Sequence, residues 1–417
     1  MTGPDEIVSL QDIEDARDRI GDVVHETPLD VSNTFARMTD ANEVHLKLEN
    51  MQRTGAYKIR GAYNKISQLP DADLENGVIA SSAGNHAQGV ALAAQTLGVD
   101  ATIVMPEVTP AAKIEATRGY GAEVVIHGDI YERAYEHTLE LAEERDLTFV
   151  HPFNDPDIIA GQGTIGLEVY DEYPSVDTML VAVGGGGLIS GIATALEQKD
   201  PGVRVVGVQT EGTAHVNESL ERDEIYERRN IDTITEGIAA SRMEHNTFEL
   251  VRERVDEVVE VDDDAVTRAL AMLTERAKTV SEAAGAVPVA ALLDGAVDVD
   301  GENVVALVSG GNIDLTELGE LTRVGLMHYG RYAHVRLALA DWPDALGTVA
   351  DVVEDAGAEL DDVRREPLTA GVDPNRHLLD AGIEGAGQDH LDDVVARLDE
   401  REGVTVVEVK SNSDHNT

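Results

Sequence analysis

Apolar residues follow two alternating patterns along the first part of the chain. Short and almost wholly apolar runs occur at residues 78–81, 101–105, 179–183, 203–208 and 304–308. Most of these runs lead into a small polar or glycine-rich turn and then into a segment whose apolar residues have helical spacing. Strands that alternate with helices in this order predict parallel sheets covered by helices on both faces. The sequence therefore indicates an α/β fold.

The N-terminal segments predict further elements of the same two kinds. Residues 11–20 place apolar side chains at helical spacing, and the Thr-Pro-Leu sequence at 27–29 ends that pattern. Residues 44–48 alternate like a half-buried strand, and a helical pattern resumes at residues 59–66. Residues 122–126 predict one more strand. All of these elements fit the same α/β arrangement.

Beyond the last buried strand the pattern changes. Residues 326–332 are expected to form a linker, and residues 333–340 alternate like a strand. A turn, a helix and two more strand patterns follow, which predicts a small α+β domain over residues 333–410. Residues 411–417 read as a disordered tail. The main domain is therefore expected to span residues 1–325.

Composition limits the classes of partner. Among 417 residues, 80 are acidic and 32 are basic, which gives a formal net charge of -48. So negative a surface repels phosphate backbones and anionic lipids, and it argues against nucleic acid and membranes as partners. The acidic excess with few lysines and 4% aromatic residues indicates a halophilic protein, since screening over roughly 3 Å at about 1 M salt removes the self-repulsion. An acidic bacterial protein without this adaptation is the alternative.

The sequence also indicates where in the cell the protein is found. It contains no cysteine, so neither disulfides nor thiolate metal sites are possible. Residues 1–10 carry acidic side chains and lack the apolar core of a signal peptide. No apolar run approaches the roughly 20 residues of a membrane span. We therefore expect a cytoplasmic protein.

One lysine stands out as a candidate nucleophile. Lys58 lies between Tyr57 and Ile59 and is flanked by Gly55 and Gly61. An amine placed among apolar groups is partly desolvated and therefore more nucleophilic, as a Schiff-base lysine must be. The alternative is a surface lysine in a loop. Other stretches of the chain favour the first interpretation.

A polar turn follows the strand at residues 78–81. It consists of Ser82, Ala83, Gly84, Asn85 and His86, and it opens an alanine-rich helix. A turn at the carboxyl end of a strand exposes free backbone N–H groups, so it predicts a site for a substrate carboxylate. Taken alone, Asn85 would be a helix cap and His86 a partner within the turn.

A second turn carries four glycines in succession. Gly184, Gly185, Gly186 and Gly187 follow a buried strand, and Leu188 begins the next helix. Glycines let the backbone approach an anion closely and point several N–H groups at it, which predicts a phosphate site. The alternative is a tight turn between strand and helix. No Gly-Lys-Ser/Thr sequence follows, so the loop is not a P-loop.

The last buried strand ends in Ser309-Gly310-Gly311-Asn312. Ser309 is placed to offer a hydroxyl to a ring nitrogen, although an ordinary turn serine is the alternative. These four stretches, in this order, resemble the pyridoxal-phosphate enzymes of fold type II, most closely the threonine dehydratases. The resemblance covers roughly residues 5–325 and implies two open, mostly parallel sheets, with a smaller lobe at residues 53–153.

The resemblance implies a role for each motif. Lys58 would form the Schiff base with pyridoxal 5'-phosphate, and Asn85 would contact the phenolate oxygen of the cofactor. Residues 184–188 would bind the phosphate, and Ser309 would meet the pyridine nitrogen. A neutral hydroxyl at that nitrogen leaves the ring a weaker electron sink, which suits elimination.

The implied reaction is β-elimination of L-threonine to 2-oxobutanoate and ammonia, with L-serine giving pyruvate, in isoleucine biosynthesis. The alternatives are a serine dehydratase or racemase, and an amino-acid-sensing module with an inactive enzyme core. Ala83 stands where the serine racemases have an acid-base serine, which argues against racemisation. Gln209 and His215 stand at the positions matched to the metal-site carboxylates of those racemases. We therefore expect no metal.

Residues 333–410 resemble the regulatory ACT domain, a βαββαβ unit that binds amino acids at subunit interfaces. This implies a homodimer or homotetramer and an amino-acid or nucleotide effector. Asp344 stands where the ACT family usually has glycine after the turn proline. Ligand binding and a purely oligomerising role therefore both remain open.

Overall fold

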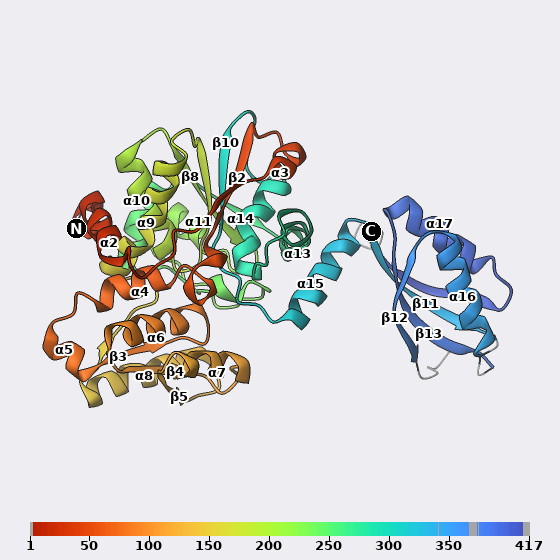
Figure 1. The fold of residues 1–417 in the computed structure, drawn as a ribbon, viewed down its shortest axis with the longest axis horizontal. Helices are drawn as coiled ribbons and strands as arrows, with labels where there is room; N and C mark the ends of the chain where they lie inside the picture. Colours follow the sequence, from red (N-terminus) through yellow and green to blue (C-terminus); the bar gives the residue numbers. More distant parts are fainter. Residues whose placement is uncertain (1–2, 341, 367–372, 374, 412–417) are drawn as a thin grey trace. The chain divides into compact units, whose positions relative to one another are not determined.

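The computed structural model describes residues 3–340, 342–366, 373 and 375–411. Its contacts divide the chain into two compact units, Met1–Asp314 and Leu315–Thr417 (Figure 1). The first unit contains a mostly parallel sheet in one lobe and a parallel sheet in the other. The second contains a single antiparallel sheet.

The large lobe is organised around a six-stranded sheet in the order β1-β2-β10-β7-β8-β9. β1 is antiparallel to β2, and the other neighbours are parallel. The central strands are almost fully buried, as expected for strands covered on both faces. The strands are β1 (Leu29–Val31), β2 (Glu43–Leu48), β7 (Thr178–Ala182), β8 (Arg204–Thr210), β9 (Glu257–Val261) and β10 (Asn303–Val308).

Helices cover both faces of this sheet (Figure 1). α9 and α10 pack against one face with α12, and α13 and α14 lie on the other. The helices of this lobe are α1 (Pro4–Ile7), α2 (Leu10–Ile20), α3 (Asn33–Met38), α9 (Pro156–Glu172), α10 (Gly187–Lys199), α11 (Val216–Arg222), α12 (His245–Arg254), α13 (Asp263–Met272) and α14 (Ala283–Leu293). Short helical turns are η1 (Glu49–Met51), η2 (Arg53–Gly55), η3 (Glu236–Ile238) and η4 (Leu273–Ala277).

The small lobe contains a four-stranded parallel sheet in the order β5-β4-β3-β6. Val78 and Ala80 pack with α4 and α6 on one face, while Ile79 packs with α8 on the other. This alternation follows from the two-residue period of a strand. The elements are α4 (Ile59–Ile66), α5 (Asp71–Asn76), β3 (Val78–Ser81), α6 (Asn85–Leu97), β4 (Ala101–Met105), α7 (Ala111–Gly119), β5 (Glu123–Ile126), α8 (Tyr131–Arg145) and β6 (Thr148–Phe149). The predicted α/β class is confirmed.

The second unit has the order β11-α16-β12-β13-α17-β14 after an initial helix, α15 (Leu315–His328). Its antiparallel sheet runs β12-β13-β11-β14, and α16 and α17 pack on it through one apolar core. The other elements are β11 (Tyr332–Leu339), α16 (Asp344–Asp355), β12 (Glu359–Glu366), β13 (His377–Glu384), α17 (Gln388–Asp399) and β14 (Val404–Lys410). This small α+β arrangement agrees with the prediction from the sequence.

The segment between the two predicted domains differs from the expectation. Residues 326–328, assigned to a linker, continue helix α15, and the division between the units falls at Asp314. Leu318 and Gly325, one heptad apart, are both buried, so the segment follows a helical period that its glycines concealed. The tail from residue 412 lies outside the described residues. No helix in the described part of the chain is long and apolar enough to cross a membrane.

Candidate active site

Two motifs from opposite ends of the first unit are held side by side. We define the Lys58 loop as residues 52–58 and the Ser309 loop as residues 309–312. The N–H of Tyr57 donates to the carbonyl of Ser309 at 3.3 Å, and a second backbone bond, from the Ser309 loop back to the Lys58 loop, measures 2.9 Å. The order of strands explains the contact, because β2 and β10 are neighbours and both lead into these loops.

The Lys58 side chain is half-buried. Its Nζ donates to the carbonyl of Pro152 at 3.0 Å and lies 5.1 Å from the centroid of the Tyr57 ring. A Cβ at Gly89 would lie 3.1 Å from the Cβ of Lys58, so this glycine lets helix α6 approach the lysine closely. The amine is therefore in a mixed apolar and polar setting between the two lobes.

The four-glycine loop connects β7 to α10 and has no room for side chains. A Cβ at Gly185 would lie 2.4 Å from the Phe153 ring. Gly186 has a φ of 88°, in the left-handed region that glycine adopts without strain. Leu188 lies in the first turn of α10 and is buried. The loop therefore presents bare backbone at a helix N-terminus, which favours an anion.

The turn after β3 also opens a helix. The N–H of Gly84 donates to the Ser82 hydroxyl at 3.2 Å, and Ala83 lies between them. His86 is buried, and its Nε2 lies 2.9 Å from the Val150 carbonyl, so Nε2 carries the proton. Burial and the nearby Lys58 charge lower the pKa of His86 to about 3, which keeps the imidazole neutral.

Asn85 is the first residue of helix α6, and the helix cap is Gly84 instead. The Asn85 Nδ2 donates to Glu282 Oε1 at 2.7 Å, and its Oδ1 accepts from Asn312 Nδ2 at 2.8 Å. Asn312 Nδ2 also donates to the Thr54 carbonyl at 2.6 Å. The side chain of Asn85 therefore joins the small lobe to both loops of the site.

Ser309 follows the last residue of β10 and is 5% exposed. Its carbonyl accepts the N–H of Tyr57, as described above. Its hydroxyl has no hydrogen bond to any of the residues that the structure describes. Ser309 therefore has a polar group left over for a ligand.

The chain was compared with known proteins. The family profile "Pyridoxal-phosphate dependent enzyme" matches residues 20–310. The chain belongs to this family. It is 42% identical to an L-threonine ammonia-lyase of Thermotoga maritima over 388 residues, 93% of this chain and 96% of that one. It is 47% identical to a catabolic L-threonine dehydratase of Staphylococcus aureus, over 77% of this chain and 93% of that one.

Solved structures give the same relationship. A processed threonine deaminase isoform from Solanum lycopersicum matches with a TM-score of 0.73 and 37% identity, over 78% of this chain and 95% of that one. A maize serine racemase matches with a TM-score of 0.72 and 34% identity, over 77% and 98%. The resemblance to fold type II enzymes inferred from the sequence is therefore confirmed.

The residues of this pyridoxal-phosphate dependent enzyme fit the cofactor. A Cβ at any of the four loop glycines would come too close to its neighbours, so the loop backbone is bare, and its N–H groups suit a phosphate. The spare hydroxyl of Ser309 suits a ring nitrogen, and the amide of Asn85 keeps one N–H beyond its bond to Glu282. Lys58 supplies the amine. We expect these residues to hold pyridoxal phosphate in the roles that the sequence predicted.

The sequence did not reveal what supports the glycine loop of the enzyme. His151 Nδ1 accepts the N–H groups of Phe153 and Asn154, at 3.2 and 2.9 Å. Burial is the main cause that lowers the pKa of His151 to about 4, so the ring stays a neutral acceptor. Asn154 Oδ1 in turn accepts the N–H of Asn246 at 3.0 Å. This turn places the Phe153 ring against the loop.

A buried group of charges anchors the helix that begins after Lys58. Arg60 donates to both oxygens of Glu49, at 2.9 and 2.8 Å, and to Glu168 at 2.5 Å. Lys47 Nζ also donates to Glu168, at 2.7 Å. Burial alone would raise the pKa of Glu49, but the charge and hydrogen bonds of Arg60 lower it below its ordinary value. We call these four residues the charge quartet.

Gln209 and His215, which the sequence matched to racemase metal ligands, have other contacts in the enzyme. Gln209 Nε2 lies 3.1 Å from His215 Nδ1, and its Oε1 accepts the N–H of Val216 at 3.0 Å. Gln209 also donates to the carbonyl of Val183, the residue before the glycine loop, at 3.2 Å. This pair therefore braces the loop from behind β7. In the described part of the chain, no three His, Asp or Glu side chains are grouped to hold a metal ion.

Proposed function

We propose that the enzyme eliminates water from L-threonine and yields 2-oxobutanoate and ammonia. The observation that carries the proposal is the similarity to an L-threonine ammonia-lyase over 93% of this chain. The four motifs that meet between the lobes supply the chemical groups that such a reaction needs. L-Serine, which lacks one methyl group, is expected to react as well and to give pyruvate.

Each group at the site has a part in this reaction. When bound, pyridoxal phosphate withdraws electrons from an amino acid and makes its α-proton acidic. The Lys58 amine accepts that proton, and the backbone N–H groups of the Ser82–His86 turn bind the substrate carboxylate. The β-hydroxyl takes up a proton and departs as water, which leaves an enamine; a second water then converts the enamine to the ketoacid and ammonia. The glycine loop and Ser309 fix the position of the cofactor.

A ketoacid assay tests the proposal. Purified protein supplied with pyridoxal phosphate and L-threonine in molar KCl should form 2-oxobutanoate and ammonia in equal amounts. Protein that binds the cofactor but forms no ketoacid from threonine or serine would contradict the proposal and favour an amino-acid-sensing module with an inactive core.

A serine racemase is the second candidate, because the maize enzyme shares the fold at 34% identity. Racemisation needs a second acid-base group on the opposite side of the α-carbon, and the methyl group of Ala83 cannot carry a proton. We therefore expect side-by-side kinetics on L-threonine and L-serine to show elimination with little D-serine.

Ala83→Ser should raise the rate of L-serine racemisation by about a hundredfold, the lower end of the factors of about a hundred to ten thousand that a positioned acid-base group contributes. Chiral chromatography of D-serine measures the change, and Ala83→Gly, which also alters the turn but adds no hydroxyl, is the matched control. Equal racemisation rates in the two variants would show that residue 83 does not set the outcome.

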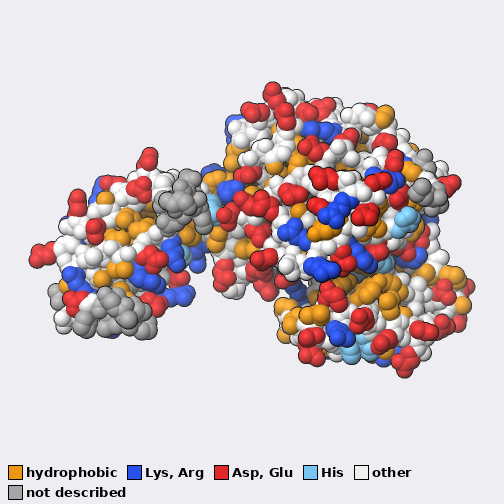
Figure 2. Space-filling view, turned by 180° about the vertical axis from the view of Figure 1, so that it is seen from behind, with side chains coloured by type: hydrophobic (Ala, Val, Ile, Leu, Met, Phe, Trp, Pro, Cys, Tyr) orange, Lys and Arg blue, Asp and Glu red, His pale blue; other side chains and the backbone are white. Residues whose placement is uncertain are grey.

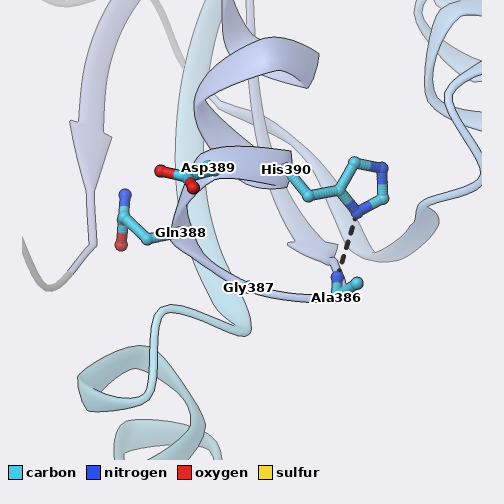
Figure 3. A pocket seen from close by; sticks show the side chains of 5 residues that line it. All are labelled: Ala386, Gly387, Gln388, Asp389 and His390. Atoms are coloured by element: carbon cyan, nitrogen blue, oxygen red, sulfur yellow. Dashed lines mark hydrogen bonds between the residues drawn. The ribbon is translucent and has the colours of Figure 1, made fainter.

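We propose that the second unit is an ACT-like regulatory or oligomerisation domain. Its order of elements supports this. A shallow, open pocket lined by residues 386–390 lies at the start of α17 (Figure 3). In that pocket His390 Nδ1 accepts the N–H of Ala386 at 3.0 Å. Activity assays with isoleucine, valine and nucleotides, together with light scattering, would identify an effector and separate dimer from tetramer. Inhibition by isoleucine would place the enzyme in isoleucine biosynthesis.

We also propose that the protein is adapted to high salt. Acidic side chains are spread over the surface (Figure 2), in keeping with the net charge of -48. The temperature midpoint of unfolding should rise as KCl increases from about 0.1 M to about 2 M, because the screening length falls from about 10 Å to below about 3 Å. A midpoint that did not rise would contradict this adaptation.

A further inference from the structure

Glu282 is a carboxyl group of the site that the reaction described above does not use. It directly precedes helix α14, and its N–H donates to the carbonyl of Gly310 at 3.1 Å. Its side chain is half-buried, and Oε1 accepts the Asn85 amide at 2.7 Å. A Cβ at Gly310 would lie only 2.3 Å from that oxygen, so the carboxyl occupies space that the glycine after Ser309 leaves open.

This contact determines what Asn85 can offer to a ligand. A primary amide has two N–H donors and one oxygen acceptor. Glu282 takes one donor, while Asn312 Nδ2 donates to the oxygen at 2.8 Å. Asn312 Nδ2 also donates to the Thr54 carbonyl, and this hydrogen bond fixes the direction of the Asn312 amide. Two hydrogen bonds thus fix the Asn85 amide, one at its nitrogen and one at its oxygen, and a single N–H remains available to a ligand.

The carboxyl of Glu282 is surrounded by groups of both charges. Lys58 and Lys113 approach it from the small lobe, and Glu236 approaches it from η3 of the large lobe. Burial is the dominant influence and raises the pKa of Glu282 to about 7, although the Asn85 bond and the two lysines act in the opposite direction. The group therefore changes its charge near neutral pH.

We propose that Glu282 is a positioning residue for the reaction: its carboxyl holds the Asn85 amide so that one N–H remains for the cofactor, and loss of its proton strengthens that hold. The proposal rests on the assignment of Asn85 to the cofactor, which is part of the proposed function. A hydrogen bond to an ionised acceptor is shorter and stronger than one to a neutral acceptor. Loss of the proton from Glu282 therefore strengthens its hydrogen bond with Asn85. Glu282 does not itself touch the reacting atoms.

Two substitutions separate the positioning from the charge. Glu282→Ala removes the acceptor and should weaken pyridoxal phosphate binding about tenfold at pH 8, the loss expected for a charge-assisted hydrogen bond. Glu282→Gln keeps an oxygen acceptor and should weaken binding by less than about threefold.

In the wild type, the affinity for pyridoxal phosphate should rise between pH 6 and pH 8 as the Glu282 carboxyl ionises. The part of this rise that comes from Glu282 should be absent in Glu282→Gln. Glu115→Gln, which removes an exposed charge paired with Arg118 on helix α7, is the control.

The cofactor-free protein gives a readout that does not depend on activity. Because the pKa of Glu282 is about 7 in the folded chain and near 4.5 when unfolded, the folded state binds the extra proton. Its contribution to stability is therefore complete below about pH 4.5 and is lost as the pH rises through 7. The unfolding midpoint of the wild type should fall across this window relative to that of Glu282→Gln.

The two readouts decide the proposal together. Equal pH dependence of unfolding in the wild type and Glu282→Gln, or unchanged cofactor affinity in Glu282→Ala, would overturn it. If Glu282→Ala does not fold, both cofactor affinity and unfolding are measured on Glu282→Gln, which is nearly the same size as the wild-type residue. The proposal is then overturned if the affinity of Glu282→Gln for pyridoxal phosphate depends on pH in the same way as that of the wild type. Failure of the proposed function would show separately, as wild-type protein that binds the cofactor and forms no 2-oxobutanoate.

Discussion

Lys58→Ala should abolish 2-oxobutanoate formation, with a loss of at least about a thousandfold in kcat, while the protein remains folded. The variant lacks the amine that we propose joins the cofactor and accepts the α-proton, and proton transfer by a positioned group alone contributes factors of about a hundred to ten thousand. The loop itself should persist, since Tyr57 is bonded through its backbone to Ser309. Coupled assay of the ketoacid measures the effect.

Lys199→Ala is the matched control for this prediction. Lys199 lies at the end of α10, where it forms a surface ion pair with Glu14 at 2.8 Å. Its loss removes one lysine without changing the site, so activity should stay within about twofold of the wild type, as expected for a partly exposed ion pair at the end of α10. Continued turnover by Lys58→Ala, with circular dichroism like that of the wild type, would refute the assignment of the amine.

Arg60→Leu should lower the free energy of unfolding by about 3 to 5 kcal/mol, because removing one partner of a buried ion pair leaves the other charge uncompensated. Arg60 and Glu49 are both 0% exposed, and Glu168 in the same charge quartet is only slightly exposed. The pKa of Glu49 should rise in the variant, since Arg60 is what lowers it in the wild type. Urea unfolding of the cofactor-free protein measures the change.

Arg17→Leu is the surface counterpart of that substitution. Arg17 pairs with Asp171 at 2.9 Å, and the two side chains are 39% and 57% exposed. Its loss should change stability by less than about 1 kcal/mol, the usual range for exposed pairs. Similar small losses in both arginine variants would show that the charge quartet does not anchor the helix after Lys58.

Local patterns in the sequence were sufficient to predict the fold class and the positions of the motifs. A buried strand such as residues 179–183 followed by four glycines can adopt few structures other than a strand, a turn and a helix. The Ser82–His86 turn likewise connects a buried strand to a helix. Ser309 could be proposed because it directly follows a buried strand, and Lys58 because it lies between Tyr57 and Ile59 in a loop flanked by glycines. The glycine loop and Ser309 follow β7 and β10, neighbouring parallel strands whose carboxyl ends lie at one edge of the large sheet.

Contacts between distant segments could not be predicted in this way. Glu282 and Asn85 are separated by 197 residues, and Arg60 and Glu168 by 108. Neither pair has a local signal, because a glutamate before a helix is common and a buried arginine looks like an exposed one in sequence. The role of Phe153 against the glycine loop was missed for the same reason. Only the packing of the lobes brings these side chains together.

Borohydride reduction of the cofactor-loaded protein, followed by peptide mass mapping, tests the central claim most directly. Reduction converts a reversible bond between an amine and the cofactor aldehyde into a permanent one, so the modified peptide identifies the lysine. The account predicts a pyridoxyl group on Lys58 and its absence from the Lys58→Ala variant. A label on Lys113 or any other lysine, or no label at all, would contradict it.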